Sequence, residues 1–350
     1  MIKKLIEFPH SIWTEGQGEF PDIVLSTRVR LARNLEQFPF PLKQNESTAH
    51  SVLENLERFA EGEEQLQLFR MQDIPELKRQ VLVEKHVISP DHVLKPEYKG
   101  LIINETGSVS IMINEEDHLR IQCFSSGLEV ENLWKIANKL DDEIEKKMEY
   151  AFDEKYGYLT CCPTNLGTGM RVSVMMHLPS LVITKQAPRI LTQLSQLGIA
   201  VRGIFGEGTE ALGDLFQISN QISLGQSEEE ILTNINSIAR RLVAQEQAAR
   251  DYLVQNAGLQ VEDKARRAFG ILTNAKFISS HEALSLISDL RLGKNAGMID
   301  GVELKLINEL YLLCQPSFLQ ILAEKPLDSQ ARDIKRAEMF KEKLDNKLEV

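Results

Sequence analysis

The chain carries the sequence VSIMINEEDHLRIQC at residues 109–123, and its hydrophobic pattern is the plainest structural signal in the polypeptide. Apolar side chains occupy every second position on either side of a polar segment, Asn114–His118. A period of two is the period at which side chains face one side of a β-strand. The pattern therefore predicts two half-buried antiparallel strands joined by the polar segment, which places the acidic triplet Glu115–Asp117 at a turn.

The segments around this hairpin mix strand and helix patterns from about residue 22 to residue 224. Residues 130–150 have apolar side chains at helical spacing, whereas residues 172–178 alternate like a strand. Residues 199–205 and 215–222 indicate a second hairpin, whose connection contains three glycines. The first two thirds of the chain therefore contain both strands and helices.

The pattern from residue 226 onward is almost entirely helical. Ser227 and Glu230 form a capping box at the start of a helix that continues to about Leu253, and a second helix is expected over residues 279–293. Strands followed by helices are typical of an α+β protein. We therefore predict a catalytic domain over residues 1–225 and a smaller helical C-terminal domain over residues 226–350.

The amino-acid composition limits the possible classes of protein and the cellular compartments in which it can act. The chain has 350 residues with 43% hydrophobic and 26% charged content, which is ordinary for a globular protein. Neither a membrane-spanning apolar run nor a secretory leader is evident, so we expect a cytoplasmic protein with no membrane partner. The formal net charge of −11 disfavours nucleic-acid binding. The four cysteines show no metal-binding spacing, so neither a direct protein metal site nor a disulfide framework is expected.

Four arginines are candidates for binding phosphate. In the segment Ser26–Arg30, Arg28 and Arg30 lie two residues apart and share one face of an extended chain, while Arg120 and Arg171 begin other predicted strands. Guanidinium groups match phosphate oxygens, so four of them converging can hold a nucleotide triphosphate without a Walker loop. The Walker motif and the motifs of the usual protein kinases are absent from the sequence. Taken singly, each arginine is equally an ordinary surface residue.

A thiol and a glycine-rich turn precede the last of these arginines, in the sequence CPTNLGTGMR at residues 162–171. Pro163 and the two glycines disfavour a regular helix or strand and allow the backbone to approach a ligand closely. Cys162 beside cations can act as a reactive thiol. Alternatively, Cys161 and Cys162 are small buried residues.

Two glutamates on predicted turns complete the candidate chemistry. A guanidinium has a pKa above 12 and must lose a proton before its nitrogen can attack phosphorus. Glu116 and Glu210 each lie beside a predicted strand end. Their carboxylates can bind the planar guanidinium, and one of them can remove the proton. The alternative is that both are solvated residues of acidic turns.

Together, the segments 26–30, 114–120 and 162–171 resemble the guanidino (phosphagen) kinase family, which includes arginine and creatine kinases. The resemblance implies a glutamine-synthetase-like antiparallel sheet flanked by helices, with ATP and Mg²⁺ as cofactors and the metal not held at a direct protein site. It also implies residue roles. Glu116 would be the catalytic base, Glu210 the guanidinium-binding partner and Cys162 the reactive cysteine. Arg28, Arg30, Arg120 and Arg171 would clamp the phosphates, and Ser26 and His86 would lie close to adenosine.

The sequence also departs from the small-molecule members of that family. An additional domain of about one hundred residues precedes the T-R-V-R segment in those kinases, and we do not expect it here because Thr27 comes early. An open site of that kind can receive an arginine on another protein, and the chain is more similar to the bacterial protein-arginine kinase subgroup. Phe205 and Met175 replace an expected phosphate-binding arginine and an expected histidine, so Arg202 or another cation is a candidate substitute.

The C-terminal sequence RDIKRA at residues 332–337 is similar to a motif of the same subgroup. The resemblance implies that Arg332, Asp333 and Arg336 bind phosphoarginine at a separate regulatory site. The alternative is an ordinary charged helix face.

The implied function is an ATP-dependent kinase that makes phosphoarginine on proteins with exposed arginines and marks them for degradation. The implied partners are a Clp ATPase and protease, a small zinc-binding activator protein and a second copy of the chain in a homodimer. Two other functions remain open. One is a kinase for small guanidino compounds, and the other is a nonenzymatic adaptor that binds phosphoarginine.

Overall fold

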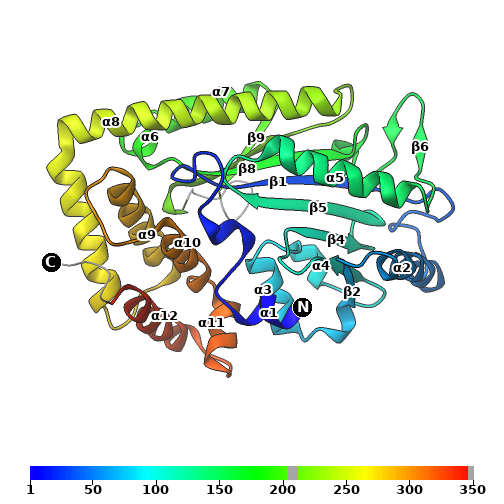
Figure 1. Ribbon diagram of the computed structural model, residues 1–350, viewed down its shortest axis with the longest axis horizontal. Coiled ribbons are helices and arrows are strands. Elements are labelled where there is room, and N and C mark those ends of the chain that lie inside the picture. Colours follow the sequence, from blue (N-terminus) through cyan, green and yellow to red (C-terminus); the bar gives the residue numbers. More distant parts are fainter. Residues whose placement is uncertain (204–211, 346–350) are drawn as a thin grey trace.

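A computed structural model describes residues 1–203 and 212–345 of the chain and contains one large antiparallel sheet (Figure 1). Over the described residues the strand order is β2-β3-β4-β5-β1-β8-β10-β9, and each neighbouring pair is antiparallel. In this order the strands span Gln67–Arg70, Gly100–Ile103, Val109–Ile113, Leu119–Ser126, Val24–Arg33, Met170–His177, Leu215–Asn220 and Ile199–Gly203. Both predicted hairpins, β4-β5 and β9-β10, are confirmed. The short strands β6 (Phe152–Asp153) and β7 (Gly157–Tyr158) form a second sheet.

One face of the large sheet is apolar and is covered by helices. Val29, Val172 and Ile218 lie on this face and belong to a core that also includes residues of α5 (Val130–Glu145) and of the first half of α8 (Glu228–Asn274). Figure 1 shows α8 running along the sheet and then turning down beside the C-terminal helices. Burial of this face supplies the main hydrophobic driving force for assembling the sheet.

The expectation that the first hairpin is only half-buried is wrong. Ile111 packs into the core shared with α5, whereas its neighbour Met112 packs into a second core on the opposite face. The second core contains residues of α1 (Ile2–Glu7) and α3 (Glu76–Glu84), which cover β3 and β4 from that side. Alternation in the sequence marks the two faces but does not reveal that helices distant in the chain cover both of them.

The C-terminal region is helical, as predicted. The capping box of Ser227 and Glu230 is present, and Ser279 caps α9 (Ser280–Asn295) by accepting a hydrogen bond from the backbone N–H of Glu282. The remaining helices are α2 (Glu46–Glu61), α4 (Pro90–Val93), α6 (Pro179–Ile183), α7 (Ala187–Gln196), α10 (Leu304–Leu313), α11 (Pro316–Ala323) and α12 (Ser329–Leu344). Among the helices that the structure describes, none combines the length and apolarity needed to cross a bilayer.

Helix α8 extends beyond Leu253, where its end was expected, and continues to Asn274. Its backbone departs from helical geometry at Ala257, where φ is −144°. Residues before this break pack with the sheet, whereas Ala265 and Leu272 after it pack with the C-terminal helices. Two helical segments that meet at this kink thus pack with the two regions, and the boundary at residues 225 and 226 stays a prediction.

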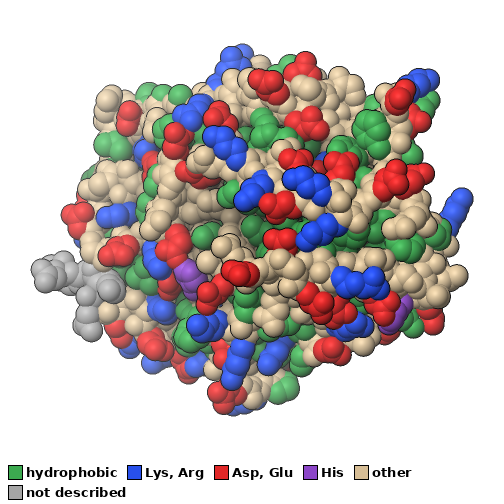
Figure 2. Space-filling view, turned by 45° about the vertical axis from the view of Figure 1, so that its right-hand side comes forward, with side chains coloured by type: hydrophobic (Ala, Val, Ile, Leu, Met, Phe, Trp, Pro, Cys, Tyr) green, Lys and Arg blue, Asp and Glu red, His purple; other side chains and the backbone are tan. Residues whose placement is uncertain are grey.

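Acidic and basic side chains are interspersed over the face of the molecule that Figure 2 shows. The net charge of −11 is therefore not gathered into a single acidic field on that face. Mixed charge of this kind is typical of solvent-exposed protein surfaces.

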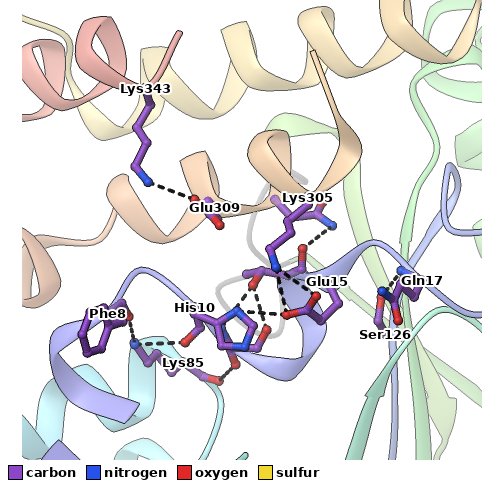
Figure 3. A network of polar contacts seen from close by, with 12 residues as sticks. Phe8, His10, Glu15, Gln17, Lys85, Ser126, Lys305, Glu309 and Lys343 are labelled. Carbon is purple, nitrogen blue, oxygen red and sulfur yellow. Dashed lines mark hydrogen bonds and ion pairs between the residues drawn. The ribbon is translucent and has the colours of Figure 1, made fainter. Parts of the chain in front are cut away.

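An N-terminal arm, residues 8–22, joins the C-terminal helices to the sheet (Figure 3). The Lys85 ammonium donates hydrogen bonds to the carbonyl oxygens of Phe8 and His10, and burial lowers its pKa to about 7. Farther along the arm, Glu15 pairs with Lys305 of α10 at 3.1 Å between carboxylate oxygen and ammonium nitrogen. The arm is therefore held at several points along its length.

A buried ion pair supports the loop that follows β7. Arg33 at the end of β1 is 1% exposed, and its guanidinium lies 2.7 Å from a carboxylate oxygen of Asp141 on α5. The same guanidinium donates to the carbonyl oxygen of Thr168 at 2.9 Å and lies 3.6 Å from the centre of the Tyr158 ring. Helix α5, strand β1 and the loop at residues 162–169 therefore meet at one buried cation.

Replacing Asp141 by alanine removes the only carboxylate that pairs with Arg33 among the described residues. Because a buried cation is then left without its counter-charge, we expect the free energy of unfolding to fall by about 3–5 kcal/mol. Urea denaturation followed by circular dichroism measures this loss. The adjacent and exposed Asp142→Ala is the matched control and should change stability by less than about 0.5 kcal/mol. Equal effects of the two variants would show that the buried pair is not important for stability.

Candidate active site

The register of the sheet places all four predicted arginines on one face. Arg30 of β1 lies directly opposite Arg171 of β8, and Ala32 lies opposite Arg120 of β5. Opposite residues of an antiparallel pair point to the same side, and so do residues two apart in a strand. Arg28, Arg30, Arg120 and Arg171 therefore share the face opposite the apolar one, and the structure brings them together as the sequence predicted.

The proximity of these arginines affects the pKa values of Arg28 and Arg30. Burial and the nearby Arg120 and Arg171 lower the pKa of Arg28 to about 10. The pKa of Arg30 is also lowered, first by burial and then by the other three arginines. Such lowering signals repulsion between cations in a region that water screens poorly. A polyanion bound among them would relieve this repulsion.

Neutral groups orient the arginines. Arg28 donates to the Gln217 side-chain oxygen at 3.0 Å and to the Ser173 hydroxyl at 3.3 Å, and Arg171 donates to the Ser219 hydroxyl at 3.1 Å. The Nε atom of Arg30 is buried without a hydrogen-bond partner among the described residues. Neutral partners fix the direction of a guanidinium without cancelling its charge.

The acidic turn between β4 and β5 meets the arginine cluster. One Arg120 nitrogen lies 2.8 Å from a carboxylate oxygen of Glu115, and another lies 3.1 Å from one of Glu116. The Glu115 side chain is buried, which raises its pKa, whereas the side chain of Glu116 is 40% exposed. Glu116 is thus next to a phosphate-binding candidate and still accessible to a substrate.

Buried polar contacts hold this turn in place. Asn114 adopts a left-handed φ of +57° and its side-chain nitrogen donates to the carbonyl oxygens of Ala49 and Tyr98, each at 2.8 Å. Asp117 accepts a hydrogen bond at 2.7 Å from the backbone N–H of Cys161. The turn that carries Glu116 is therefore tied directly to the residue before Cys162.

The loop after Cys162 packs against the buried side chain of Arg33. A Cβ atom at Gly169, where φ is +64°, would collide with the Arg33 side chain and the carbonyl oxygen of Ala32. The Cys162 sulfur contacts the Thr164 hydroxyl at 3.1 Å and is not fully buried. Cys161 is also only partly buried, and burial together with Asp117 raises its pKa to about 12. The alternative of two fully buried cysteines is wrong, because the loop runs along the surface of a cavity.

Three connected cavities occupy this side of the sheet. The arginine trough, of about 420 Å³, is lined by Arg28, Arg30, Arg120, Arg202, His86, Gln217 and their neighbours. The thiol pocket, of about 250 Å³, is lined by Arg30, Glu116, Arg120, Cys162, Arg171 and Arg202. Because Arg30, Arg120 and Arg202 line both, the two cavities adjoin.

The third cavity, the aromatic recess, adjoins the other end of the trough and has a volume of only about 30 Å³. Its walls include Trp13, Ser26, His86, Phe124 and Tyr311. His86 lines both the recess and the trough, and its left-handed φ of +62° is unusual for a residue other than glycine. Burial and Arg28 lower the pKa of His86 to about 4, so its ring is neutral at neutral pH.

Several predicted site residues lie elsewhere. Glu210 and Phe205 fall outside the described residues. Arg332, Asp333 and Arg336 lie on α12 and line none of the three cavities.

The RDIKRA segment makes structural contacts in the helical region. Arg336 is 2% exposed, pairs with Asp333 at 2.7 Å, and donates to the carbonyl oxygens of Ile278 and Cys314. Arg332 donates to the carbonyl oxygen of Leu327 at 2.9 Å. These contacts join α12 to the start of α9 and the end of α10, and the binding of phosphoarginine by this segment stays a prediction.

The cavity residues that sequence reasoning missed include Trp13, Gln217, Tyr311 and Gln315. The period-two pattern of β10 could have placed Gln217 on the same face as Arg202, its partner in β9. Tyr311 and Gln315 lie at the end of an apolar helix without any recognisable motif. Only the packing of that helix against the sheet reveals them.

Comparison with known families agrees with this geometry. A family model described as the ATP:guanido phosphotransferase C-terminal catalytic domain matches residues 47–249. A second model, the protein-arginine kinase McsB C-terminal domain, matches residues 258–349. The first match includes every strand of the large sheet except β1, and the second covers the C-terminal helical region.

Curated relatives match almost the whole chain. Protein-arginine kinases of Symbiobacterium thermophilum and Bacillus velezensis are each 47% identical to it, over 97% and 98% of this chain and 98% and 96% of their own lengths. A protein-arginine kinase of Halothermothrix orenii is 45% identical over 98% of this chain and 99% of its own.

Solved structures share the fold. A lombricine kinase superposes with a TM-score of 0.60 at 23% identity, covering 71% of this chain and 75% of that one. A duplicated taurocyamine kinase from Schistosoma mansoni superposes with a TM-score of 0.59 at 24% identity, covering 81% of this chain and 45% of that one. The predicted fold, an antiparallel sheet flanked by helices with a helical C-terminal region, is thus confirmed. The chain belongs to the ATP:guanido phosphotransferase family and, within it, to the protein-arginine kinases.

Proposed function

We propose that this protein transfers the γ-phosphoryl group of ATP to the guanidinium of arginine side chains in other proteins. The observation that carries the proposal is the cavity system that four partly buried arginines line together with Glu116 and Cys162. Its arginine-rich part suits a triphosphate, and its acidic part suits a cationic acceptor. Family membership supports the same reaction class.

The nucleotide enters as its magnesium complex. The described residues include no cluster of three or more histidine, cysteine or acidic side chains suited to a metal ion. Magnesium commonly reaches a kinase site on phosphate oxygens and keeps several waters. Arg28, Arg30, Arg120 and Arg171 fit the phosphate oxygens as permanently charged forks. Their role is to position the phosphates and to neutralise charge that develops during transfer.

Glu116 is the proposed catalytic base. As the acceptor nitrogen forms its bond to the γ-phosphorus, the bond from that phosphorus to the bridging oxygen of ADP breaks. The guanidinium proton passes to the Glu116 carboxylate, and ADP leaves. Glu116 lies 3.1 Å from Arg120, so the proton acceptor adjoins the phosphate-binding region. Glu210 is proposed to grip the other side of the guanidinium.

Cys162 is proposed to adjust the electrostatics of the acceptor. Its side chain lines the thiol pocket together with Glu116 and Arg171. The loop is anchored on one side by the contact of Cys161 with Asp117 and on the other by Arg33. A rigid anchor keeps the sulfur at a constant distance from the reacting nitrogen.

Ser26 and His86 are proposed to contact the nucleoside, since both line the recess at the end of the trough. Arg202 is proposed to take part in phosphate binding, because it lines both the trough and the thiol pocket.

We further propose the cellular setting that the family resemblance implies. The protein acts in the cytoplasm, forms a homodimer, and marks its substrates for a Clp ATPase and protease with the help of a small zinc-binding activator. Arg332, Asp333 and Arg336 are proposed to sense phosphoarginine. The match of residues 258–349 to the protein-arginine kinase C-terminal domain supports a specialised role of this region.

The molecule that accepts the phosphoryl group distinguishes the proposed function from the two alternative functions. Incubating the purified protein and its activator with radiolabelled ATP should transfer label to an arginine-rich protein, and the label should be released by acid because it is in a P–N bond. Phosphoserine and phosphothreonine survive the same treatment. Exclusive labelling of free arginine would favour a kinase of small guanidino compounds. ATP turnover that stays at background would favour a binding adaptor.

The variant Glu116→Gln keeps the shape of the side chain but cannot accept the proton. We expect kcat to fall by about 10²- to 10⁴-fold, with ADP binding by calorimetry little changed. Glu210→Gln should also lower kcat. The exposed Glu105→Gln, on the turn between β3 and β4, is the matched control and should retain wild-type rates. Wild-type activity of Glu116→Gln would rule out the proposed base.

The variant Arg30→Met should separate stability from activity. Removing one of four clustered cations relieves repulsion, so the free energy of unfolding should rise by about 0.5–2 kcal/mol. The same change should lower kcat by about 10²-fold or more, because one phosphate ligand is lost. Thermal melts measure the change in stability and initial-rate assays with a protein substrate measure kcat, with the exposed Arg58→Met as control in both. A variant that is less stable yet fully active would contradict the proposed cluster.

A further inference from the structure

We propose that Trp13 and Tyr311 recognise the nucleobase, by hydrogen bonding a water molecule in the aromatic recess that in turn contacts the edge of the base. This assigns a specificity role to two residues outside the arginine cluster. It rests on the proposed function, because the nucleotide must lie in the arginine trough.

The location of the recess places it at the nucleoside end of the cavity. Arg28, His86, Met175 and Gln217 line both the recess and the trough, so the two spaces adjoin. The phosphates belong at the other end, where Arg30 and Arg120 continue into the thiol pocket. A nucleotide bound with its γ-phosphate toward Glu116 therefore extends its base toward the mouth of the recess.

The size of the recess determines what can enter it. Its volume of about 30 Å³ is sufficient to hold a water molecule. The trough, of about 420 Å³, is much larger, so we place the base there, with one edge at the mouth of the recess. A bridging water provides a hydrogen bond nearly as favourable as a direct one.

Two polar groups of the recess walls lack a protein partner. The indole nitrogen of Trp13 and the hydroxyl oxygen of Tyr311 are both buried, and neither has a hydrogen-bond partner among the described residues. Trp13 is 5% exposed and Tyr311 is 1% exposed. Buried polar groups are costly when unpaired, so such groups beside a ligand cavity point to a water or ligand that satisfies them.

The chemistry of these groups suits a purine. The Trp13 N–H is always a donor, and burial raises the pKa of the Tyr311 phenol, so that its proton also stays in place. The polar part of the walls also includes the Ser26 hydroxyl and the neutral His86 ring. A water that accepts hydrogen bonds from two such donors can only donate its own O–H groups, to acceptor atoms of the base such as the N1 atom of adenine, which in guanine carries a proton. The donor pattern at the base edge differs between adenine and guanine.

Contacts of the N-terminal arm hold the turn that carries Trp13 beside the helix that carries Tyr311. Trp13 lies in a short 3₁₀ turn, Ile12–Glu15, and Glu15 pairs with Lys305 of α10, the helix that carries Tyr311 (Figure 3). Asn308 of the same helix donates to the carbonyl oxygen of Thr14 at 3.4 Å. The Trp13 ring also lies 5.9 Å from the ring of His86. The recess is therefore a fixed structure.

The two residues come from outside the catalytic family match. Trp13 precedes residues 47–249, and Tyr311 lies within residues 258–349, the match to the C-terminal domain. The helical region is therefore part of the nucleotide site, and it supplies Gln315 to the trough as well.

The test measures nucleotide affinity by calorimetry with ADP and GDP, each with Mg²⁺, for the full-length chain. Tyr311→Phe removes one oxygen atom, and Trp13→Phe removes the indole N–H. Each variant should bind ADP about 3- to 10-fold more weakly, as expected for one lost hydrogen bond, while GDP binding changes less. The preference for adenine over guanine should therefore decrease. Tyr252→Phe, at an exposed tyrosine of α8, and Trp134→Phe, on α5, are matched controls that should bind both nucleotides as the wild type does.

Unchanged ADP affinity in Tyr311→Phe overturns the inference, and so does an equal loss for ADP and GDP, which would indicate an effect on packing. Trp134→Phe leaves Trp13 as the only tryptophan, so ADP should shift its fluorescence, and an unaltered spectrum also counts against the inference. If the wild type binds ADP and the variants bind it with the same affinity, this inference alone is refuted. A wild-type protein that does not bind MgADP refutes the proposed function.

Discussion

Repulsion among four guanidinium groups is the constraint that the surrounding structure must overcome. Arg28, Arg30, Arg120 and Arg171 project from three adjacent strands into a space where burial and mutual charge lower the pKa values of Arg28 and Arg30. Isolated strands would not place these cations together. The register of a large sheet does so, because the apolar face opposite them is buried against α5 and α8. Hydrophobic burial on one face thus stabilises an unfavourable charge arrangement on the other.

Neutral and acidic groups both orient the charges of the cluster. Gln217, Ser173 and Ser219 accept hydrogen bonds from Arg28 and Arg171, and each is neutral. Arg120 pairs with Glu115 and Glu116 on the acidic turn. A site prepared in this way needs little reorganisation when a phosphate enters, and preorganisation of this kind is a major source of catalytic rate.

Two regions far apart in the chain complete the cavity at its ends. The loop that carries Cys162 is positioned by Arg33 and by the contact of Cys161 with Asp117. At the opposite end, the N-terminal arm and α10 close the cavity from outside the sheet. The helical C-terminal region thus contributes walls to the catalytic cavity while its own segment, RDIKRA, is engaged in packing α12 against α9 and α10. Changes in the packing of these helices therefore have a direct physical route to the nucleotide end of the cavity.

Local sequence patterns determined the elements, because alternation, helical spacing and capping depend on neighbouring residues only. The hairpin around Glu116, the start of α8 at Ser227 and the shared face of Arg28 and Arg30 all follow from such patterns. Tertiary structure determined the features of the fold that such local patterns cannot specify. It buried both faces of β4, extended α8 past Leu253 through contacts with the C-terminal helices, and brought Trp13 and Tyr311, nearly three hundred positions apart, to the same recess. Packing between distant segments depends on the whole arrangement of the chain, and no local signal in the sequence specifies it.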